Sequence, residues 1–547
     1  MNLFSTAYRS FWLTLTSGVT LIFAFPPIGL AWAAWLTPIG ALRLIDGSPE
    51  HSKINKRQVW MASFLCWLVL FQCVRLPHWA GYLGWPLLSA YLSFYLFFFI
   101  LVSRHLLHRW KIPLMMVAPV TWVGLEYLQA HLFTGISLAM LSHTQVSFPI
   151  IIQVADIAGC YTISFLMVAT AAGAYRICTG IGKMRLAAAA QVLFCISLLL
   201  GYGNYRLDQT DRELKKHPFQ IALIQGAIDT RFPATREEAQ AYYQEIYEQY
   251  AQLSISSRQS KVDLIVWPES MFPVYDAYSK SDSLTEEQQE SLQRSQAQIR
   301  MQSQFLSGSR VPTTKDGSNP TIRNPVPMLV GVNSFDLLNE NSISNSAVLV
   351  NQNGVVTDRY SKMKLVLFGE YVPLGDQFPW LYSAFPMSQG LVAGDAPTAI
   401  QVQKYRFAPN ICFESTYPHL IRNHVDELVK QDSKPDCLVN LANDGWFWGS
   451  NALDYHWANS RLRSVENRTP MIIASNTGFS GSIDSAGRVM AKGPRRDKTV
   501  LHVSLMTTDQ EAIYHFWGDW PVFLCFLVVL GCFLDWIQSF LIRRNYN

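Results

Sequence analysis

Long apolar runs at both ends of the chain constrain its fold more than any other feature of the sequence. Crossing the hydrocarbon core of a bilayer takes roughly 20 mostly apolar residues in a helix, which satisfies its own backbone hydrogen bonds. We therefore predict an integral membrane α-helical bundle of eight transmembrane helices, at residues 8–24, 28–45, 59–76, 86–107, 112–132, 148–177, 183–204 and 519–542.

The N-terminal run has a second interpretation. The residues AWA at 31–33 have the small-x-small pattern of a cleavage site, and Arg9 provides the charged flank of a secretory signal peptide. Because the apolar stretch continues well past this site, we favour a retained membrane helix.

Basic residues in the short loops predict the orientation of the bundle, because such loops stay in the cytoplasm. The predicted outer loops at 77–85 and 133–147 contain no Lys or Arg. If the N-terminus is cytoplasmic, the basic residues near the span ends fall on the inner side, namely Lys53, Lys56, Arg57, Arg104, Arg109, Lys111, Arg176, Lys183, Arg185, Arg543 and Arg544. The net charge of +4 therefore reflects topology and does not indicate nucleic-acid binding.

Composition divides the chain into three parts. Only 15% of all residues are charged, against about 25% in typical soluble proteins, but residues 211–510 resemble an ordinary polar globular domain. We predict a seven-helix transmembrane domain at 1–210, a domain outside the cytoplasm at 211–510 and a C-terminal transmembrane helix within 511–547.

The external domain alternates short apolar runs with polar helical stretches, which is typical of layered α/β packing. The segment 307–325 has turn-forming residues without periodicity, so we expect a mobile insertion there. Strands are expected at 219–228, 263–270, 327–335, 345–351, 407–415, 436–444, 471–477 and 499–505, and helices at 236–257, 284–306, 417–430 and 452–468.

Two of the nine cysteines, Cys412 and Cys437, lie in the external domain, whereas the other seven fall inside predicted spans or, in the case of Cys178, directly after one. In a membrane span, cysteine acts as a small hydrophobic residue. In an oxidising compartment, the two external thiols are candidates for one structural disulfide. The residues around Cys412 favour a reactive thiol instead.

Three predicted strands end in residue types that acyl chemistry uses: Glu269 in VWPES, Lys362 in RYSKMK and Cys412 in NICFES. A thiol with a pKa of about 8.5 is a weak nucleophile until a base such as a buried glutamate removes its proton. Lys362 and a backbone N–H near Cys412 would stabilise the negative oxygen of the tetrahedral intermediate. Each residue alone is more often structural, but the three motifs together predict a cysteine acyl-transfer centre.

These motifs also carry a family resemblance. LIVWPES, RYSKMKLVLFGEYVP and NICFES resemble the Glu, Lys and Cys motifs of the nitrilase superfamily, and LVNLANDGWF resembles the stretch that follows them. With the eight predicted spans and FGEYVP after the lysine, the chain resembles the bacterial apolipoprotein N-acyltransferase family over nearly its whole length. The resemblance implies an α/β nitrilase-like α-β-β-α sandwich at 211–510, in the periplasm, on a multi-pass protein of the bacterial inner membrane.

The resemblance implies a role for each site residue. Glu269 is the general base, Lys362 the oxyanion stabiliser and Cys412 the nucleophile, while the supporting residues are Glu370, Glu414 and Phe413. Cys412 takes an acyl chain from a membrane phospholipid as a thioester, and the α-amino group of the diacylglyceryl-cysteine of an apolipoprotein accepts it, in a ping-pong sequence. The resemblance implies no cofactor and no metal.

A phospholipid substrate must reach the site from the membrane, because moving acyl chains through water costs about 0.8 kcal/mol per methylene. Ionisable residues inside spans are functional candidates by default, and Arg75, Glu126 and Asp156 lie near the outer ends of theirs. We interpret these three, with Trp267 and Phe232, as a candidate substrate entrance. Snorkelling to the interface is the structural alternative for the three charged residues.

A thioester must also be shielded from water. The apolar segments FPW at 378–380 and FWGS at 447–450 are candidate lid elements, with interfacial aromatic anchoring as the alternative. The chain departs from the family pattern at Phe413, where tyrosine is common, at Leu367, where proline is expected, and at Phe232, where tryptophan is expected. These departures affect substrate fit and leave the three catalytic residue types intact.

Two other functions use the same residues. A membrane-tethered nitrilase-type amidase would hydrolyse a C–N bond with water in place of the acceptor amine, but a small polar amide needs no access from lipid. A non-enzymatic scaffold would keep the fold without the chemistry, and the complete set of Glu269, Lys362 and Cys412 argues against it.

Overall fold

The computed structural model describes residues 6–48, 52–231, 233, 235–281, 283–307, 325–339, 342–384 and 389–545. The chain forms two compact units. The first contains Met1–Arg212, Tyr417–His419 and Glu511–Asn547, and the second contains Glu213–Thr416 and Leu420–Gln510. Apart from its two end residues, the insertion expected at 307–325 lies outside the described residues.

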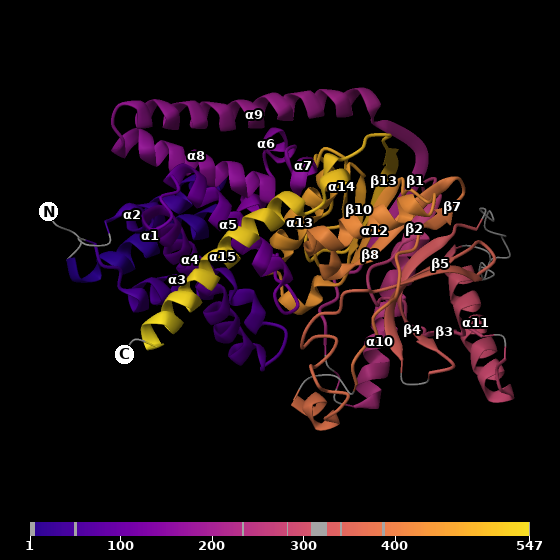
Figure 1. Ribbon diagram of the computed structural model, residues 1–547. Helices are drawn as coiled ribbons and strands as arrows, with labels where there is room; N and C mark the ends of the chain where they lie inside the picture. Colours follow the sequence, from indigo (N-terminus) through magenta and orange to yellow (C-terminus); the bar gives the residue numbers. More distant parts are fainter. Residues whose placement is uncertain are drawn as a thin grey trace. The chain divides into compact units, whose positions relative to one another are not determined.

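The first unit is helical, and most of it is drawn in indigo, purple and yellow in Figure 1. Short 3₁₀ segments, η2 (Ala31–Leu36) and η3 (Gln72–Arg75), lie next to α2 and α3. Its α-helices are α1 (Arg9–Ala24), α2 (Thr37–Asp46), α3 (Lys56–Leu70), α4 (Gly81–His108), α5 (Leu114–His131), α6 (Pro149–Ile152), α7 (Ala155–Ala158), α8 (Tyr161–Thr179), α9 (Lys183–Glu213), α14 (Ile513–Trp517) and α15 (Trp520–Asn545).

Within the described ranges, four helices are long and apolar enough to cross a membrane: α4, α8, α9 and the Trp520–Ser539 part of α15. The helices α1, α2 and α3 are shorter, at 16, 10 and 15 residues. The prediction of one continuous span at 148–177 is wrong, because Gly159 with φ of +73° separates α6 and α7 from α8. Length and composition thus identify four clear spans, not the expected eight.

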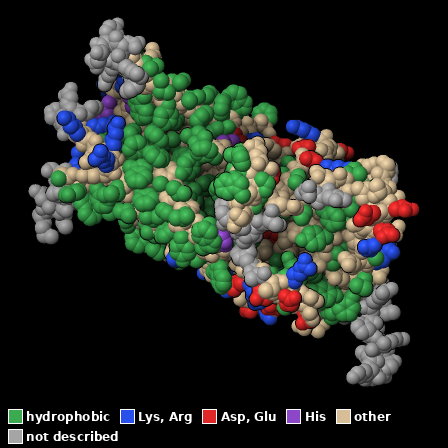
Figure 2. Space-filling view, turned by 90° about the horizontal axis from the view of Figure 1, so that it is seen from below, with side chains coloured by type: hydrophobic (Ala, Val, Ile, Leu, Met, Phe, Trp, Pro, Cys, Tyr) green, Lys and Arg blue, Asp and Glu red, His purple; other side chains and the backbone are tan. Residues whose placement is uncertain are grey.

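The surface of the helical unit is strongly apolar. Figure 2 shows hydrophobic side chains covering a broad, nearly uninterrupted area of it. In water such a surface would be unfavourable by about 25 cal/mol per Å², whereas lipid tails solvate it well. Large apolar side chains are exposed along α9 and α15, among them Leu186, Leu193, Phe194, Leu524, Leu534 and Ile537. This surface fits a membrane bundle.

The second unit contains two β-sheets. The first sheet has the order β13-β1-β2-β4-β5-β6, with β3 paired to β4, and the second has the order β12-β11-β10-β9-β8-β7. The strands are β1 (Lys215–Gln225), β2 (Leu264–Val266), β3 (Asp276–Tyr278), β4 (Met328–Asp336), β5 (Ile343–Val350), β6 (Val356–Ser361), β7 (Ile400–Val402), β8 (Tyr405–Ile411), β9 (Cys437–Ala442), β10 (Met471–Ser475), β11 (Gly481–Ile483), β12 (Val489–Lys492) and β13 (Thr499–Thr507).

The two sheets pack face to face, with helices on both outer faces. In β1, Ile221 and Leu223 join the core between the sheets, while Ala222 and Ile224 face the helix layer, as the two-residue period of a strand requires. The helices α10 (Arg236–Ser257) and α11 (Glu286–Ser307) cover the first sheet, and α12 (Pro418–Lys430) and α13 (Ala452–Asn467) cover the second. The second unit is therefore the expected α-β-β-α sandwich.

The predicted elements of this unit are all present. Each of the eight expected strands and four expected helices overlaps an observed one. Five strands lie outside the eight predicted ranges. Of these, β6 has six residues and was expected only as the strand that ends at Lys362, whereas β3, β7, β11 and β12 are three or four residues long. Runs that short carry too little periodicity to be distinguished from loops.

Candidate active site

Cys412 lies where β8 ends and the short helix η6 (Cys412–Thr416) begins. Its φ is +53°, an uncommon value for a residue with a Cβ atom. The side chain is buried, with 5% of the residue surface exposed. A strained backbone at a buried turn persists only where its surroundings hold it, and such positions concentrate at functional sites.

Glu269 lies three residues after the end of β2, and its carboxylate is buried. Its Oε1 accepts hydrogen bonds from Asn345 Nδ2 at 2.7 Å and from Lys362 Nζ at 3.1 Å, and its Oε2 accepts one from the Asn443 backbone N–H at 2.9 Å. A Cβ atom at Gly331 on β4 would lie 2.6 Å from the Cα of Glu269, so the close approach of this segment to β4 requires glycine.

Lys362 follows β6 and is almost fully buried, with 1% of its surface exposed. Its Nζ donates to Glu269 Oε1 at 3.1 Å and to Glu370 Oε1 at 2.7 Å. The Asn345 amide also donates to both carboxylates, at 2.7 Å and 3.3 Å. The other oxygen of Glu370 accepts the Val366 N–H at 2.8 Å. One ammonium group thus lies between two carboxylates.

The electrostatics of this cluster favour a protonated thiol at rest. Burial lowers the pKa of Lys362, but Glu269 and Glu370 outweigh it and hold that pKa well above its ordinary value. Burial and then the Glu269 carboxylate raise the pKa of the Cys412 thiol well above its ordinary value, against the opposing charge of Lys362. The structure therefore brings the three predicted residues together, and the thiol needs a base before it can attack.

Glu414 connects the segment after Lys362 to the turn at Cys412. Its Oε1 accepts the backbone N–H groups of Met363 at 2.7 Å and Lys364 at 2.9 Å. Its Oε2 accepts the Ile411 N–H at 2.7 Å and the Tyr360 hydroxyl at 2.8 Å. Burial raises the pKa of Glu414 even though these donors oppose the shift. This carboxylate holds the backbone and has no oxygen left without a donor.

Aromatic rings surround the turn. The Phe413 ring lies parallel to the His456 imidazole and meets the Phe447 ring edge-on at 5.5 Å. Phe447 belongs to the candidate lid segment 447–450, so this segment packs beside the residue that follows Cys412. In the other candidate lid segment, the rings of Phe378 and Trp380 are exposed.

Trp267, one of the expected entrance residues, lies elsewhere. Trp267 is fully buried, its Nε1 donates to Ser254 Oγ at 2.8 Å, and its ring packs between Tyr250 and Phe272. The expectation that Trp267 lies at an entrance is therefore wrong, because it sits next to Val266 of β2 and points to the helix layer. Phe232 lies outside the described residues.

In the helical unit, Asp156 is fully buried and is neither exposed nor snorkelling. Its Oδ2 lies 2.7 Å from Arg206 Nε, and its Oδ1 accepts the Tyr202 hydroxyl at 2.7 Å. The Arg75 guanidinium lies 5.9 Å from the centroid of the Trp85 ring. Asp535 of α15 pairs with His105 of α4 at 2.7 Å and with Arg109, the residue after that helix, at 3.1 Å.

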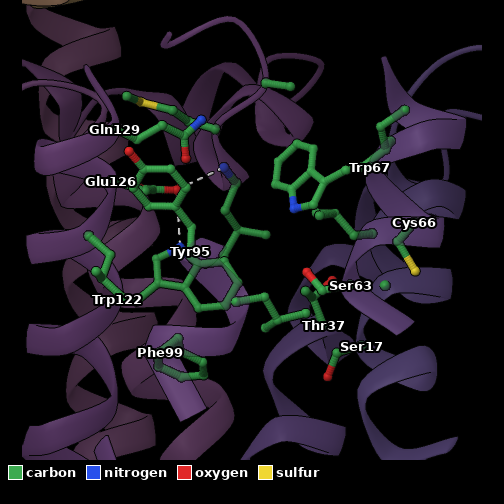
Figure 3. Close-up of a pocket in the computed structure, with 18 residues that line it drawn as sticks. Ser17, Thr37, Ser63, Cys66, Trp67, Tyr95, Phe99, Trp122, Glu126 and Gln129 are labelled. Carbon is green, nitrogen blue, oxygen red and sulfur yellow. Dashed lines mark hydrogen bonds between the residues drawn. The ribbon is translucent and has the colours of Figure 1, made fainter. Parts of the chain in front are cut away.

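Glu126 on α5 faces a cavity of about 60 Å³ inside the bundle (Figure 3). Its Oε1 accepts the Trp122 Nε1–H and the Leu141 backbone N–H, both at 3.0 Å. Gln129 and Tyr95 lie on the same side of this cavity as Glu126. Most of the remaining lining is apolar, so Glu126 is the charged group of an internal cavity of the helical unit.

The two cysteines of the second unit do not form a disulfide. Cys412 and Cys437 are both free thiols, so the structural disulfide is wrong. Among the residues that the structure describes, no group of three or more His, Cys, Asp or Glu side chains is arranged to hold a metal ion.

Sequence reasoning missed several polar partners of the site. Asn345 bridges Glu269 and Glu370, and the Asn443 N–H binds Glu269, yet each looked like one polar residue in an apolar strand. His456 contacts the Cys412 carbonyl, and Asp444 contacts His456. Asp444 lies in the LVNLANDGWF stretch, and His456 lies in the helix predicted at 452–468. One signal was available: a polar residue in a strand or helix that is otherwise fully buried must find a hydrogen-bond partner, and this partner could have been sought in the site.

Comparisons with known proteins match both units. Residues 17–173 match the apolipoprotein N-acyltransferase N-terminal domain, and residues 220–513 match the carbon-nitrogen hydrolase family. A protein from Rhodopirellula baltica named apolipoprotein N-acyltransferase is 28% identical, over 98% of this chain and 99% of that protein. One of the same name from Geobacter metallireducens is 30% identical, over 94% and 93%. An amidase structure from Nesterenkonia aligns with 56% of this chain and 98% of its own, at 13% identity and a TM-score of 0.35.

Proposed function

This chain belongs to the apolipoprotein N-acyltransferase family, and from that membership we propose that it moves an acyl chain from a membrane phospholipid to the α-amino group of the diacylglyceryl-cysteine of apolipoproteins. The observation that carries the proposal is the buried cluster of Glu269, Lys362 and Cys412, in a sandwich joined to a strongly apolar helical unit. The thioester route and the roles of the three residues are parts of the same proposal.

The proposal includes the setting of the enzyme. The protein crosses the bacterial inner membrane several times and its catalytic domain, residues 211–510, lies in the periplasm. Four clear spans and the basic residues of the predicted inner loops support this placement. The shorter apolar helices of the same unit, such as α1 and α3, complete the proposed eight spans within residues 1–210 and 511–547.

The first half-reaction forms a thioester. Glu269 accepts the proton of the Cys412 thiol, and the thiolate attacks the ester carbonyl of a phospholipid. The C–S bond forms, the tetrahedral intermediate collapses, and the ester C–O bond breaks. The glycerol oxygen of the departing lysophospholipid takes the proton back from Glu269, which restores the carboxylate.

The second half-reaction forms the amide. The neutral α-amino group of the diacylglyceryl-cysteine attacks the thioester carbonyl and gives one proton to Glu269. The C–N bond forms and the C–S bond breaks, and the Cys412 thiolate recovers its proton from Glu269. The same carboxylate thus serves both halves, and no cofactor is needed to balance them.

The cluster geometry suits this cycle. In each tetrahedral intermediate the former carbonyl oxygen is negative, and the Lys362 ammonium is the nearby fixed positive charge that stabilises it. Glu370 keeps Lys362 charged and in place, at 2.7 Å, so that protonation of Glu269 does not release the lysine. The burial of Cys412 limits access of water to the thioester.

The test is the intact mass of the purified full-length protein after incubation with a defined phospholipid in detergent micelles, with Cys412→Ser alongside. The expected result is a mass gain of one acyl chain. Hydroxylamine should remove it, and so should a diacylglyceryl-cysteine peptide, which becomes N-acylated. The variant should show no adduct of this lability.

Two outcomes would count against the proposal. If folded protein forms no adduct with any phospholipid headgroup tried, the acyl-donor part is wrong. If an adduct forms but only water removes it, the enzyme is a hydrolase, and release of ammonia from small amides then tests the membrane-tethered amidase as the alternative.

A further inference from the structure

A second set of buried polar side chains holds the backbone of the nucleophile. The carbonyl oxygen of Cys412 lies 3.0 Å from His456 Nε2 and accepts a hydrogen bond from Asn440 Nδ2, also at 3.0 Å. The other ring nitrogen of His456, Nδ1, lies 3.0 Å from Asp444 Oδ1. His456 belongs to α13, Asn440 to β9 and Asp444 to η7 (Asp444–Phe447). These three side chains and Cys412 are all buried.

The partners of His456 determine its protonation state. A neutral imidazole has one N–H donor and one acceptor nitrogen. Both groups facing His456, a backbone carbonyl and a carboxylate, only accept hydrogen bonds, so both ring nitrogens must donate. The side chain is therefore an imidazolium cation. Burial lowers the pKa of His456, but Asp444, the Cys412 carbonyl and Glu269 together raise it above its ordinary value.

Asp444 and the imidazole are themselves fixed in place. The Oδ2 of Asp444 accepts the Ser475 hydroxyl at 3.0 Å. A Cβ atom at residue 478 would lie 2.1 Å from the same oxygen, so only Gly478 leaves room for this carboxylate. The Phe413 ring stacks on the imidazole at an interplanar angle of 3°. These contacts fix both side chains in the observed arrangement.

We propose that His456 and Asp444 form a positioning pair for the Cys412 nucleophile. The imidazolium holds the Cys412 carbonyl and so keeps the residue at its strained φ of +53°, which aims the thiol at the cluster of Glu269 and Lys362. It also places a fixed positive charge beside the thiolate that forms during catalysis. This inference rests on the proposed acyl transfer through Cys412.

The charges around Cys412 explain how the pair of His456 and Asp444 affects formation of the thiolate. Glu269 faces His456 as well as Lys362 and also raises the pKa of the imidazole. Asp444 raises the pKa of the Cys412 thiol, so an uncompensated Asp444 carboxylate would oppose thiolate formation. Within the Asp444 pair the imidazolium supplies the compensating charge, as Lys362 does between Glu269 and Glu370.

Two variants separate position from charge. His456→Gln removes the cation and leaves the Asp444 charge uncompensated. Asp444→Asn removes both charges but keeps the contact, since a neutral His456 still donates to Cys412 and accepts from the new amide. The matched control is His502→Gln, because His502 is an exposed residue on β13 of the same unit.

Two rates are measured on the full-length protein from pH 5 to 10. One is thioester formation from phospholipid, and the other is alkylation of Cys412 by iodoacetamide, followed on its own peptide. We expect His456→Gln to slow thioester formation about tenfold or more at neutral pH and to move the alkylation midpoint up by about one pH unit. Asp444→Asn should stay within about threefold of the native rate, and the control should match it.

A purely structural role would lower the melting temperature of both variants without moving the alkylation midpoint, and that result would overturn the proposal. A native rate and midpoint in His456→Gln would overturn it as well. If His456→Gln does not fold, the NMR chemical shifts of the ring carbons in ¹³C-histidine-labelled native protein report the protonation state of His456. A neutral His456 at pH 7 would contradict the proposed pair. Alkylation needs no lipid, so it tests the pair even if the native protein takes no acyl chain.

Discussion

The two units bury their charges in different ways. In the helical unit, Asp156 meets one cation, Arg206, at 2.7 Å, and the Tyr202 hydroxyl satisfies its other oxygen. In the sandwich, Lys362 meets two carboxylates, Glu269 and Glu370, at 3.1 Å and 2.7 Å. The first arrangement is neutral, whereas the second keeps an excess carboxylate.

This difference indicates which buried charges serve structure and which serve chemistry. A neutral pair offsets the cost of removing two ions from water and has no reason to exchange a proton. A buried carboxylate without a cation of its own can take up a proton with less loss of electrostatic energy. This criterion agrees with the proposed role of Glu269 as a base and predicts a structural role for Asp156. Four expected outcomes test the distinction.

The largest effect is expected from removing the excess carboxylate. Glu269→Gln keeps the shape and an acceptor for Lys362 but cannot take the Cys412 proton, so the rate of thioester formation should fall by about 10²–10⁴-fold. The melting temperature should change little, because Glu370 still pairs with Lys362. Single-turnover acylation measured by intact mass checks the rate.

The control for this variant is Glu245→Gln, which removes an exposed carboxylate paired with Arg231 at 2.8 Å. It should acylate at the native rate. Native-like acylation in Glu269→Gln would remove the basis for assigning Glu269 as the base.

The opposite outcome is expected in the helical unit. Asp156→Asn leaves Arg206 buried without a counter-charge, which should destabilise the folded protein by about 3–5 kcal/mol. The acylation rate per folded molecule should stay native. Denaturation of the detergent-solubilised protein, followed by tryptophan fluorescence, measures the loss.

Asp208→Asn is the matched control, since Asp208 pairs with Arg212 at 2.8 Å on the same helix but both side chains are exposed. It should cost at most about 1 kcal/mol. If both variants lose the same free energy of unfolding, burial does not make the Asp156–Arg206 pair more important for stability than the exposed pair.

A smaller kinetic effect is expected from Glu370→Gln. The lysine keeps Glu269 but loses its second carboxylate, so Glu269 becomes the sole counter-charge of Lys362 and a weaker base. The acylation rate should fall about 10–100-fold, with the dependence on lipid concentration unchanged. A loss as large as that of Glu269→Gln would show that the two carboxylates are equivalent, contrary to the geometry.

The last outcome concerns two buried histidines that differ in their partners. His456 has Asp444, which raises the pKa of the imidazole despite burial, whereas burial lowers the pKa of His424 to about 4. The stability contributed by neutral His424 is present above its unfolded pKa of about 6.5 and is lost as pH falls towards 4. The stability contributed by charged His456 is present below about 6.5 and is lost as pH rises through its raised pKa.

These signs predict opposite changes in the pH dependence of the melting temperature. His424→Gln should weaken the fall of the melting temperature at acid pH, where the native protein loses on the order of 3 kcal/mol of unfolding free energy. His456→Gln should weaken the fall of the melting temperature at alkaline pH. Thermal melts from pH 4 to 9 check both, and a shift on the same side in the two variants contradicts the assignment of charge.

Much of the sandwich could be predicted from the sequence because its strands are apolar and separated by turn signals. The eight predicted strands all exist, and the missed ones, such as β3 and β7, are three residues long. The bundle was harder to predict, since a helix buried among other helices need not be long or fully apolar. The helix α5 contains Glu126, whose carboxylate is satisfied inside the unit by Trp122 and Leu141.

The three residue types of the site could also be read from the sequence, because each ends a strand in a distinctive motif. Their partners could not. Asn345 and His456 have no local signal that separates them from ordinary polar residues, and Trp267 beside Glu269 looked accessible although it is core. Hydrogen bonds between segments more than 40 residues apart depend on how strands pair within a sheet and on how a helix packs on it.

The sequence by itself determined that this chain has a lipid-facing part and a layered α/β part, and which residue types are available for acyl chemistry. Hydropathy and periodicity are local properties, and they carry that information directly. Only the tertiary structure decided that Glu269 shares Lys362 with Glu370 and that His456 holds the Cys412 carbonyl as a cation. Protonation and charge balance depend on distances of about 3 Å between side chains remote in sequence, and only the packing of the sandwich sets these distances.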